Sequence, residues 1–158
     1  MPAILLFSGC GDSSMEASHI GTFAMGERVQ IGPLTYVVNE TDWRHQMGQG
    51  AAASTPDNRF LFVNLSISNK GSQPVSLPLT VLHDAKGETH TELTENLTDV
   101  SEWLGLFRTV EPGATAQGYV IFDVPMGAYK LQVSDGGDIG AEKTALIEIP
   151  AQVPVPIQ

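Results

Sequence analysis

The chain has 158 residues, 42% of them hydrophobic and 16% charged, which is enough for one domain with a proper core. Its formal net charge is −10 and its eight lysines and arginines are spread singly, so the basic patch that nucleic-acid binding requires is absent and we expect no nucleic-acid partner. A single cysteine excludes an internal disulfide. An anionic membrane surface would repel so acidic a domain unless an anchor holds it there.

The beginning of the chain resembles a bacterial lipoprotein signal. An apolar run over residues 2–7 leads to the small residues Ser8 and Gly9, then to Cys10 and a polar Gly-Asp-Ser-Ser tether. The pattern resembles a lipobox, which implies a diacylglycerol on the Cys10 thiol and cleavage on its N-terminal side. It departs from the usual signal in three respects: Phe7 stands where leucine is usual, no basic residue precedes the run, and the run is shorter than the usual ~7–15 residues. The alternative is an apolar N-terminus with a chance cysteine.

These features predict the organisation of the chain. We expect a signal remnant over residues 1–9, whose beginning would lie upstream, and a lipidated Cys10 with a flexible tether over residues 10–22. A folded domain would span residues 23–150. A proline-rich tail would follow over residues 151–158, because alternating prolines cannot donate to a β-ladder. An apolar run this short excludes a transmembrane helix at the N-terminus.

From Phe23 onward, short alternating runs separated by Gly and Pro turns predict strands. Arg59–Asn69 is the clearest, since Leu61, Val63, Leu65 and Ile67 would share one face and polar residues the other. The remaining predicted strands cover residues 27–31, 34–38, 75–82, 118–124, 129–133 and 145–149. Seven or eight strands without intervening helices indicate an all-β fold, an immunoglobulin-like antiparallel β-sandwich.

Residues 93–107 break this pattern. Leu93, Leu97, Val100, Leu104 and Phe107 are spaced by four, three, four and three residues, which predicts a short amphipathic helix across a sheet edge. The alternative is a loop that is plugged by its own apolar side chains.

The order of several motifs resembles a known family. Gly26-Glu27-Arg28-Val29, the run FLFVNLSISN over residues 60–69, Pro112-Gly113 and the run GYVIFDVP over residues 118–125 follow one another as in secreted and lipid-anchored bacterial proteins with an immunoglobulin-like sandwich. The chain is similar in this respect to the mycobacterial secreted immunogenic antigens, over about residues 23–149. This resemblance implies an extracytoplasmic domain of unknown function and supplies no catalytic residues.

No motif for catalysis is present. The chain has no nucleophile elbow and no phosphate-binding glycine loop, so we expect no enzyme activity and no cofactor. The best metal candidate is a hairpin in which Glu88, His90 and Glu92 would share one strand face and His83 would lie nearby. A solvated polar hairpin explains the same residues.

Two stretches are candidates for binding. Trp43, Arg44 and His45 end a strand, and loops at the ends of sandwiches commonly carry binding residues. Trp103 and Leu106 would lie off the centre of the predicted helical stripe and be partly exposed, as an interface anchor is. For both tryptophans the alternative is burial in the core.

The sequence therefore predicts an extracytoplasmic binding or adaptor module of the bacterial cell envelope, without catalysis, attached to the membrane through a lipid on Cys10. Its partner would be an envelope protein or ligand that the sequence does not identify. The alternative is a carrier of a small ligand or a metal that uses the hairpin of His83 and His90.

Overall fold

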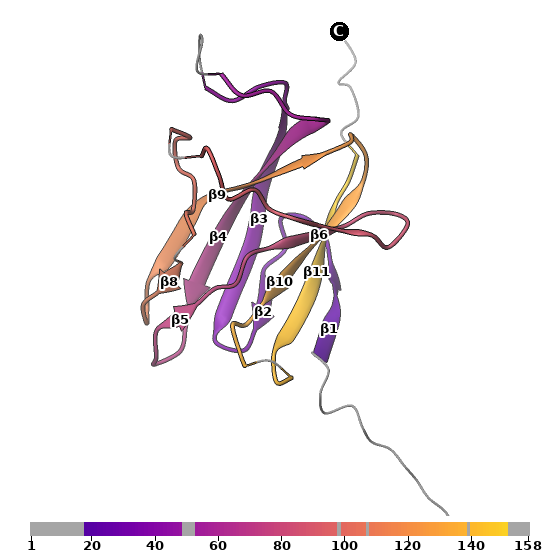
Figure 1. Cartoon of the computed structure of the whole chain (residues 1–158). Helices are drawn as coiled ribbons and strands as arrows, with labels where there is room; N and C mark the ends of the chain where they lie inside the picture. Colours follow the sequence, from indigo (N-terminus) through magenta and orange to yellow (C-terminus); the bar gives the residue numbers. More distant parts are fainter. Residues whose placement is uncertain (1–17, 49–52, 98, 107, 139, 152–158) are drawn as a thin grey trace, which may run out of the picture.

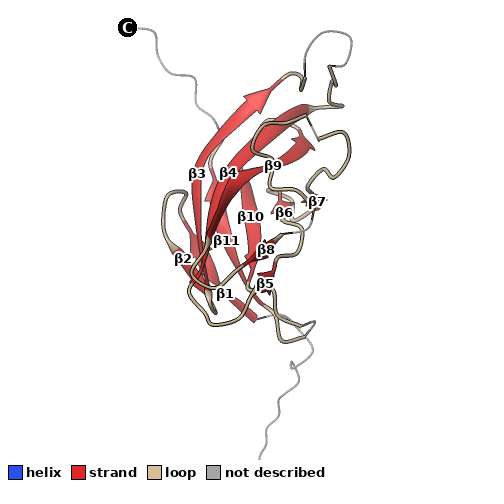
Figure 2. Ribbon diagram, turned by 90° about the vertical axis from the view of Figure 1, so that its left-hand side faces the viewer, coloured by secondary structure: helices blue, strands red, loops and turns tan. Residues whose placement is uncertain are grey.

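A computed structural model describes residues 18–48, 53–97, 99–106, 108–138 and 140–151 of the chain. This part folds into eleven strands and contains no helix, and hence none that could span a membrane (Figure 2). The strands are β1 (Ser18–Phe23), β2 (Val29–Ile31), β3 (Leu34–Arg44), β4 (Arg59–Asn69), β5 (Val75–Ser76), β6 (Val81–His83), β7 (Thr89–Thr91), β8 (Thr109–Val110), β9 (Thr115–Val124), β10 (Tyr129–Ser134) and β11 (Lys143–Ile149).

The strands form a β-sandwich, which confirms the predicted fold class. One sheet has the order β1-β11-β10-β6-β7 and the other the order β2-β3-β4-β9, with β5 and β8 paired separately (Figure 1). All pairings are antiparallel except that of β1 with β11, which is parallel. A strand at the start of the domain therefore pairs with the strand at its end.

The main core lies between the two sheets. The alternation predicted for β4 is confirmed, since Leu61, Val63, Leu65 and Ile67 are all buried in the main apolar cluster. Adding to this packing, the Tyr36 hydroxyl on β3 donates to the Ser134 carbonyl on β10 at 2.6 Å and so connects the two sheets. Burial raises the pKa of Tyr36, so the hydroxyl stays protonated and able to donate.

The expected tether is too long. Residues 18–22 were predicted to be linker, but they belong to β1. Their pairing with β11 changes register between His19 and Thr22, where Gly21 has a φ of 149°. Because the strand is short, irregular and paired to a distant segment, it carries no alternation that could reveal it.

The strand predicted over residues 75–82 is split in two. Val75–Ser76 pairs with β8, whereas Val81–His83 joins the five-stranded sheet beside β10. Pro78 lies in the break, and proline has no backbone N–H to offer to a ladder. The chain thus passes from one pairing to another within a few residues.

The predicted helix over residues 93–107 is wrong. The segment that we call the strap, residues 93–97 and 99–106, consists of turns, bends and irregular backbone, and Asn96 and Glu102 have φ angles of 61° and 64°. Left-handed residues at these two positions interrupt any right-handed helix. The alternative, a loop plugged by its own apolar side chains, describes what the structure shows.

The strap follows the open edge of β9. The Leu93 N–H donates to the Ile121 carbonyl at 2.7 Å, the Leu104 N–H donates to the Tyr119 carbonyl at 3.0 Å, and the Tyr119 N–H donates to the Glu102 carbonyl at 2.7 Å. Gly118 permits this approach, since a methyl group there would overlap the Glu102 carbonyl oxygen. The β9 edge of the four-stranded sheet is therefore covered around Tyr119 and Ile121 rather than left open to other chains.

A second apolar cluster lies under the strap, on the outer face of the four-stranded sheet. Its buried members are Met47, Phe60, Phe62, Leu97 and Ile121, with strap residues packed around them. The outer face of β4 was expected to be polar. It is apolar at Phe60 and Phe62, which the strap covers, and polar at Ser66 and Ser68 toward the end of the strand.

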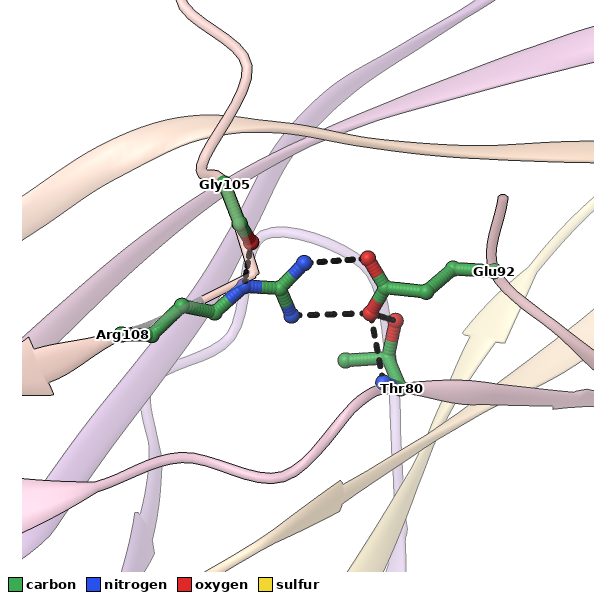
Figure 3. Close-up of polar contacts among 4 residues, drawn as sticks. All are labelled: Thr80, Glu92, Gly105 and Arg108. Atoms are coloured by element: carbon green, nitrogen blue, oxygen red, sulfur yellow. Dashed lines mark hydrogen bonds and ion pairs between the residues drawn. The ribbon is translucent and has the colours of Figure 1, made fainter. Parts of the chain in front are cut away.

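A buried ion pair fastens the strap to the strands before it. The two terminal nitrogens of Arg108 donate to the two carboxylate oxygens of Glu92, and the bond to Oε2 is 2.8 Å long (Figure 3). The Arg108 Nε donates to the Gly105 carbonyl at 2.6 Å. The same Oε2 accepts the backbone N–H and the hydroxyl of Thr80, at 2.6 and 2.7 Å. The two charged side chains are 3% and 0% exposed. All polar groups in this cluster are thus paired with one another.

The two ends of the sandwich differ in what they carry. The starts of β1 and β11, at Ser18 and Lys143, pair with each other, and they lie at the same end of the sandwich as the end of β4 (Figure 1). The end of β3 and the start of β10 lie at the other end, where the rings of Trp43 and Tyr129 are 6.4 Å apart, together with the close of β11. We refer to these as the Ser18 end and the Tyr129 end.

Candidate functional site

Two hollows large enough for a small molecule lie at the Tyr129 end. The Arg44 hollow has a volume of about 610 Å³ and lies between the four-stranded sheet and the strap; its lining includes Arg44, Gln46, Phe62, Asp99, Glu102 and Tyr119. The Tyr129 hollow has a volume of about 860 Å³ and lies on the five-stranded sheet; its lining includes Ala24, His83, Tyr129, Lys130, Leu146 and Glu148. Both volumes fall within the range of about 300–1,000 Å³ that ligand pockets occupy.

Arg44 lies over an aromatic ring. Its guanidinium carbon is 3.9 Å from the centroid of Phe62 and 6.0 Å from that of Tyr119, within the range of a cation–π contact. Its Nε donates to Asp42 Oδ2 at 2.7 Å. The contact with Phe62 and the ion pair with Asp42 both restrain the guanidinium.

The neighbours of Arg44 in the sequence go elsewhere. Trp43 points to the inside of the sandwich, where it is partly buried against the main core and its ring lies 6.4 Å from that of Tyr129. His45 is exposed and accepts a hydrogen bond from Arg59 Nη1 at 2.7 Å on ring Nδ1. Of the three predicted binding residues, Arg44 therefore lines a hollow and Trp43 packs.

The Tyr129 hollow is bounded by the end of β1 and by the β6–β7 hairpin. Lys130 on β10 lies between its cross-strand neighbours His83 on β6 and Glu148 on β11, so charged and polar groups line the middle of the hollow. The Tyr129 hydroxyl donates to the Pro125 carbonyl at 2.5 Å, and burial raises its pKa. Apolar walls with a few polar groups are typical of sites for small ligands.

The hairpin histidines do not come together. His83 pairs with Thr89, so His90, the next residue along β7, faces the opposite side of the sheet. The His83 ring bonds Gln132 Oε1 at 2.7 Å, whereas His90 Nε2 lies 3.1 Å from Asp84 Oδ2. This hydrogen bond from His90 is the main reason why the pKa of Asp84 is lowered.

The carboxylates proposed with these histidines are also dispersed. Glu88 is exposed, and Glu92 is buried in its ion pair with Arg108. Within the described ranges, no group of three His, Cys, Asp or Glu side chains could hold a metal ion. The predicted metal hairpin is thus not assembled in the structure.

Trp103 and Leu106 differ in exposure. Trp103 is partly buried against the second apolar cluster, and its backbone forms an isolated parallel β-bridge with Tyr119. Its indole Nε1 is buried and has no hydrogen-bond partner in the described part of the chain. Leu106 is 43% exposed. Packing is therefore the better description of Trp103, and Leu106 is the residue of this pair that a partner could reach.

Replacing Trp103 with alanine should lower the free energy of unfolding by about 3 kcal/mol, the lower end of the range for removing a buried aromatic side chain. Thermal melting measures the effect, and Leu106→Ala is the matched control, with an expected change within about 0.5 kcal/mol. A Trp103→Ala domain that melts like the unmodified protein would return Trp103 to the candidates for docking.

Several site residues are absent from the sequence-based candidates. Phe62 and Tyr119 reach the Arg44 hollow because β4 lies between β3 and β9, with Phe62 paired to Asp42 and to Ile121. Lys130 and Glu148 meet only through the pairing of β10 with β11. Such residues require the strand register, which local alternation does not give.

The fold and the two hollows define the chain as a β-sandwich domain with ligand-sized depressions at one end. The model of the family described as "Domain of unknown function (DUF4352)" matches residues 23–144, and the chain belongs to this family. No curated protein matches the chain.

Solved bacterial structures share the fold. The yjhA protein from Bacillus subtilis is 16% identical, with a TM-score of 0.60 over 79% of this chain and 99% of its own. A "putative lipoprotein (ycdA)" from Bacillus subtilis subsp. subtilis str. 168 is 18% identical, with a TM-score of 0.59 over 78% of this chain and 38% of its own.

A functionally unknown protein from Listeria monocytogenes EGD-e is 13% identical, with a TM-score of 0.60 over 80% of this chain and 82% of its own. At these identities the likeness establishes the fold. These matches do not show the resemblance to the mycobacterial antigens, which stays an expectation.

Proposed function

We propose that the chain is a lipid-anchored, extracytoplasmic binding module of the bacterial cell envelope, without catalytic activity. The observation that carries this proposal is that the expected anchor and the two hollows lie at opposite ends of the sandwich. Seven residues separate Cys10 from Ser18, which lies at one end of the domain, and both hollows lie at the other end. A lipid on Cys10 would therefore leave the Tyr129 end facing away from the membrane, where a partner can reach it.

Two further observations support the location. The lipobox-like run before Cys10 suits attachment, and ycdA, which shares the fold, is described as a putative lipoprotein. The similarity of the motif order to secreted mycobacterial antigens points to the same side of the membrane. With a net charge of −10, the domain would gain nothing from anionic lipids, so attachment would depend on the lipid itself.

Replacing Cys10 with serine should release the protein from membranes. The unmodified chain is expressed in a bacterium behind a complete lipoprotein signal. The serine variant is expressed behind an ordinary secretory signal that is removed without the cysteine, so that no uncleaved apolar segment holds it. Membranes are then separated in detergent-free buffer. The unmodified protein should fractionate with membranes and incorporate an alkyne-tagged fatty acid, because two or more acyl chains give stable anchoring. The serine variant should be soluble and unlabelled.

The matched control is Ser8→Ala, which keeps a small residue before the cysteine and should leave attachment unchanged. A Cys10→Ser protein that stays with membranes would contradict the anchor. A soluble Cys10→Ser protein with intact binding at the Tyr129 end is the result that the proposal requires.

A second candidate function is that of a carrier for a small ligand, and the Tyr129 hollow favours it. The hollow has a volume of about 860 Å³ and combines apolar walls with His83, Lys130 and Glu148. Native mass spectrometry of protein purified from membranes tests this function. A retained small molecule would support a carrier, and its absence would favour the binding module.

A further inference from the structure

The Arg44 guanidinium is held in place with one edge unused. Its guanidinium carbon lies 3.9 Å from the centroid of the buried Phe62 ring, and its Nε donates to Asp42. In the part of the chain that the structure describes, neither terminal nitrogen of Arg44 has a hydrogen-bond partner. A fixed guanidinium with a free pair of N–H donors matches the two oxygens of a carboxylate.

The strap supplies the opposite charge. Asp99 and Glu102 line the same hollow as Arg44, and neither forms an ion pair in the described residues. The lining therefore carries one positive and two negative groups. A simple anion would meet the two carboxylates, and a simple cation would meet Arg44.

The remaining lining is polar and uncharged at several points. Gln46, Asn96, Ser101 and Tyr119 all line the hollow. Amide and hydroxyl groups of this kind can pair with peptide N–H and C=O groups. The volume of about 610 Å³ suits a ligand from a single amino acid to a short peptide.

We propose that the Arg44 hollow binds a small zwitterion, a free amino acid or short peptide, with its carboxylate on Arg44 and its ammonium toward Asp99 and Glu102. The inference rests on the proposed binding function and deepens it by naming the ligand class of one site. A ligand with both charges at opposite ends satisfies both sides of the hollow at once.

Calorimetric titration with three probes tests the ligand class. Dialanine carries both charges, its N-acetyl derivative lacks the ammonium, and its C-terminal amide lacks the carboxylate. Dialanine should bind at least tenfold more tightly than either derivative. Equal binding of all three probes, or no binding of dialanine up to millimolar concentration, would overturn the proposal.

Variants assign the two charges to residues. In Arg44→Gln, dialanine should bind no better than its amide does to the unmodified protein. In the double variant Asp99→Asn/Glu102→Gln, it should bind no better than the N-acetyl derivative. Thermal melting checks that each variant is folded, and all of these positions are exposed at the surface.

Lys130→Gln, in the Tyr129 hollow, is the matched control and should leave dialanine binding unchanged. If Lys130→Gln abolished binding while Arg44→Gln did not, the ligand would occupy the wrong hollow for this proposal. If dialanine did not bind but the protein were attached to the membrane through Cys10, only the proposed ligand class would be overturned. If dialanine bound but the protein were not attached to the membrane, only the proposed lipid anchor would be overturned.

Discussion

Replacing Arg108 with methionine should destabilise the domain by about 3–5 kcal/mol, because it leaves the Glu92 carboxylate buried without a partner charge. Arg108 donates to both oxygens of Glu92, and the two side chains are almost fully buried. Methionine keeps much of the volume of the arginine stem, so the loss reports the charge rather than a cavity. Equilibrium unfolding in urea measures it.

Two further variants distinguish the effect of leaving Glu92 buried without a partner from the effect of losing a positive charge in general. Lys130→Met removes an exposed cation and should change the free energy of unfolding by less than about 0.5 kcal/mol. The double variant Glu92→Met/Arg108→Met removes both charges and should recover part of the loss. Recovery should be incomplete, since Glu92 also accepts the backbone N–H of Thr80. An Arg108→Met domain as stable as the Lys130→Met domain would show that the pair contributes little.

This ion pair could not be found from the sequence. Glu92 is a candidate metal ligand when only the hairpin is considered, and Arg108 lies 16 positions away with nothing to connect the two. The pairing depends on the path of the strap, which returns the chain to the side of Glu92 so that Arg108 can bond both of its oxygens. Long-range pairing of single charges leaves no periodic signal.

The strands that could be predicted are those with local alternation. Arg59–Asn69 pairs with β3 and β9 along nearly its whole length, and its inward residues were predicted correctly because they alternate in the sequence. The strap shows the limit of the same reasoning. Its apolar spacing fits a helix, but the residues instead fill the outer face of the sheet around left-handed positions at Asn96 and Glu102.

The candidate site was predictable to a similar extent. Arg44 was found because it ends a strand beside a loop, which is a local property. Phe62 and Tyr119, which support it, belong to β4 and β9 and come together only through cross-strand pairing. Cys10 lies outside the residues that the structure describes, so its role depends on the fractionation experiment.

Leu65→Asp should unfold the domain. Leu65 is fully buried in the main core, in the middle of the central strand β4. Aspartate there would lose the apolar contacts and place a carboxylate without a partner among them, at a cost of several kcal/mol for the charge alone. Domains of this size have a total stability of about 5–15 kcal/mol, so one such change uses most of it.

The matched control is Gln30→Asp, which adds the same charge at an exposed position between the buried residues Val29 and Ile31 of β2. Because its side chain faces solvent, this variant should keep a cooperative melt within a few degrees of the unmodified domain. Circular dichroism during heating distinguishes the two variants. A soluble Leu65→Asp protein with a cooperative transition would mean that Leu65 does not face the core, and that the register on which both hollows depend is wrong.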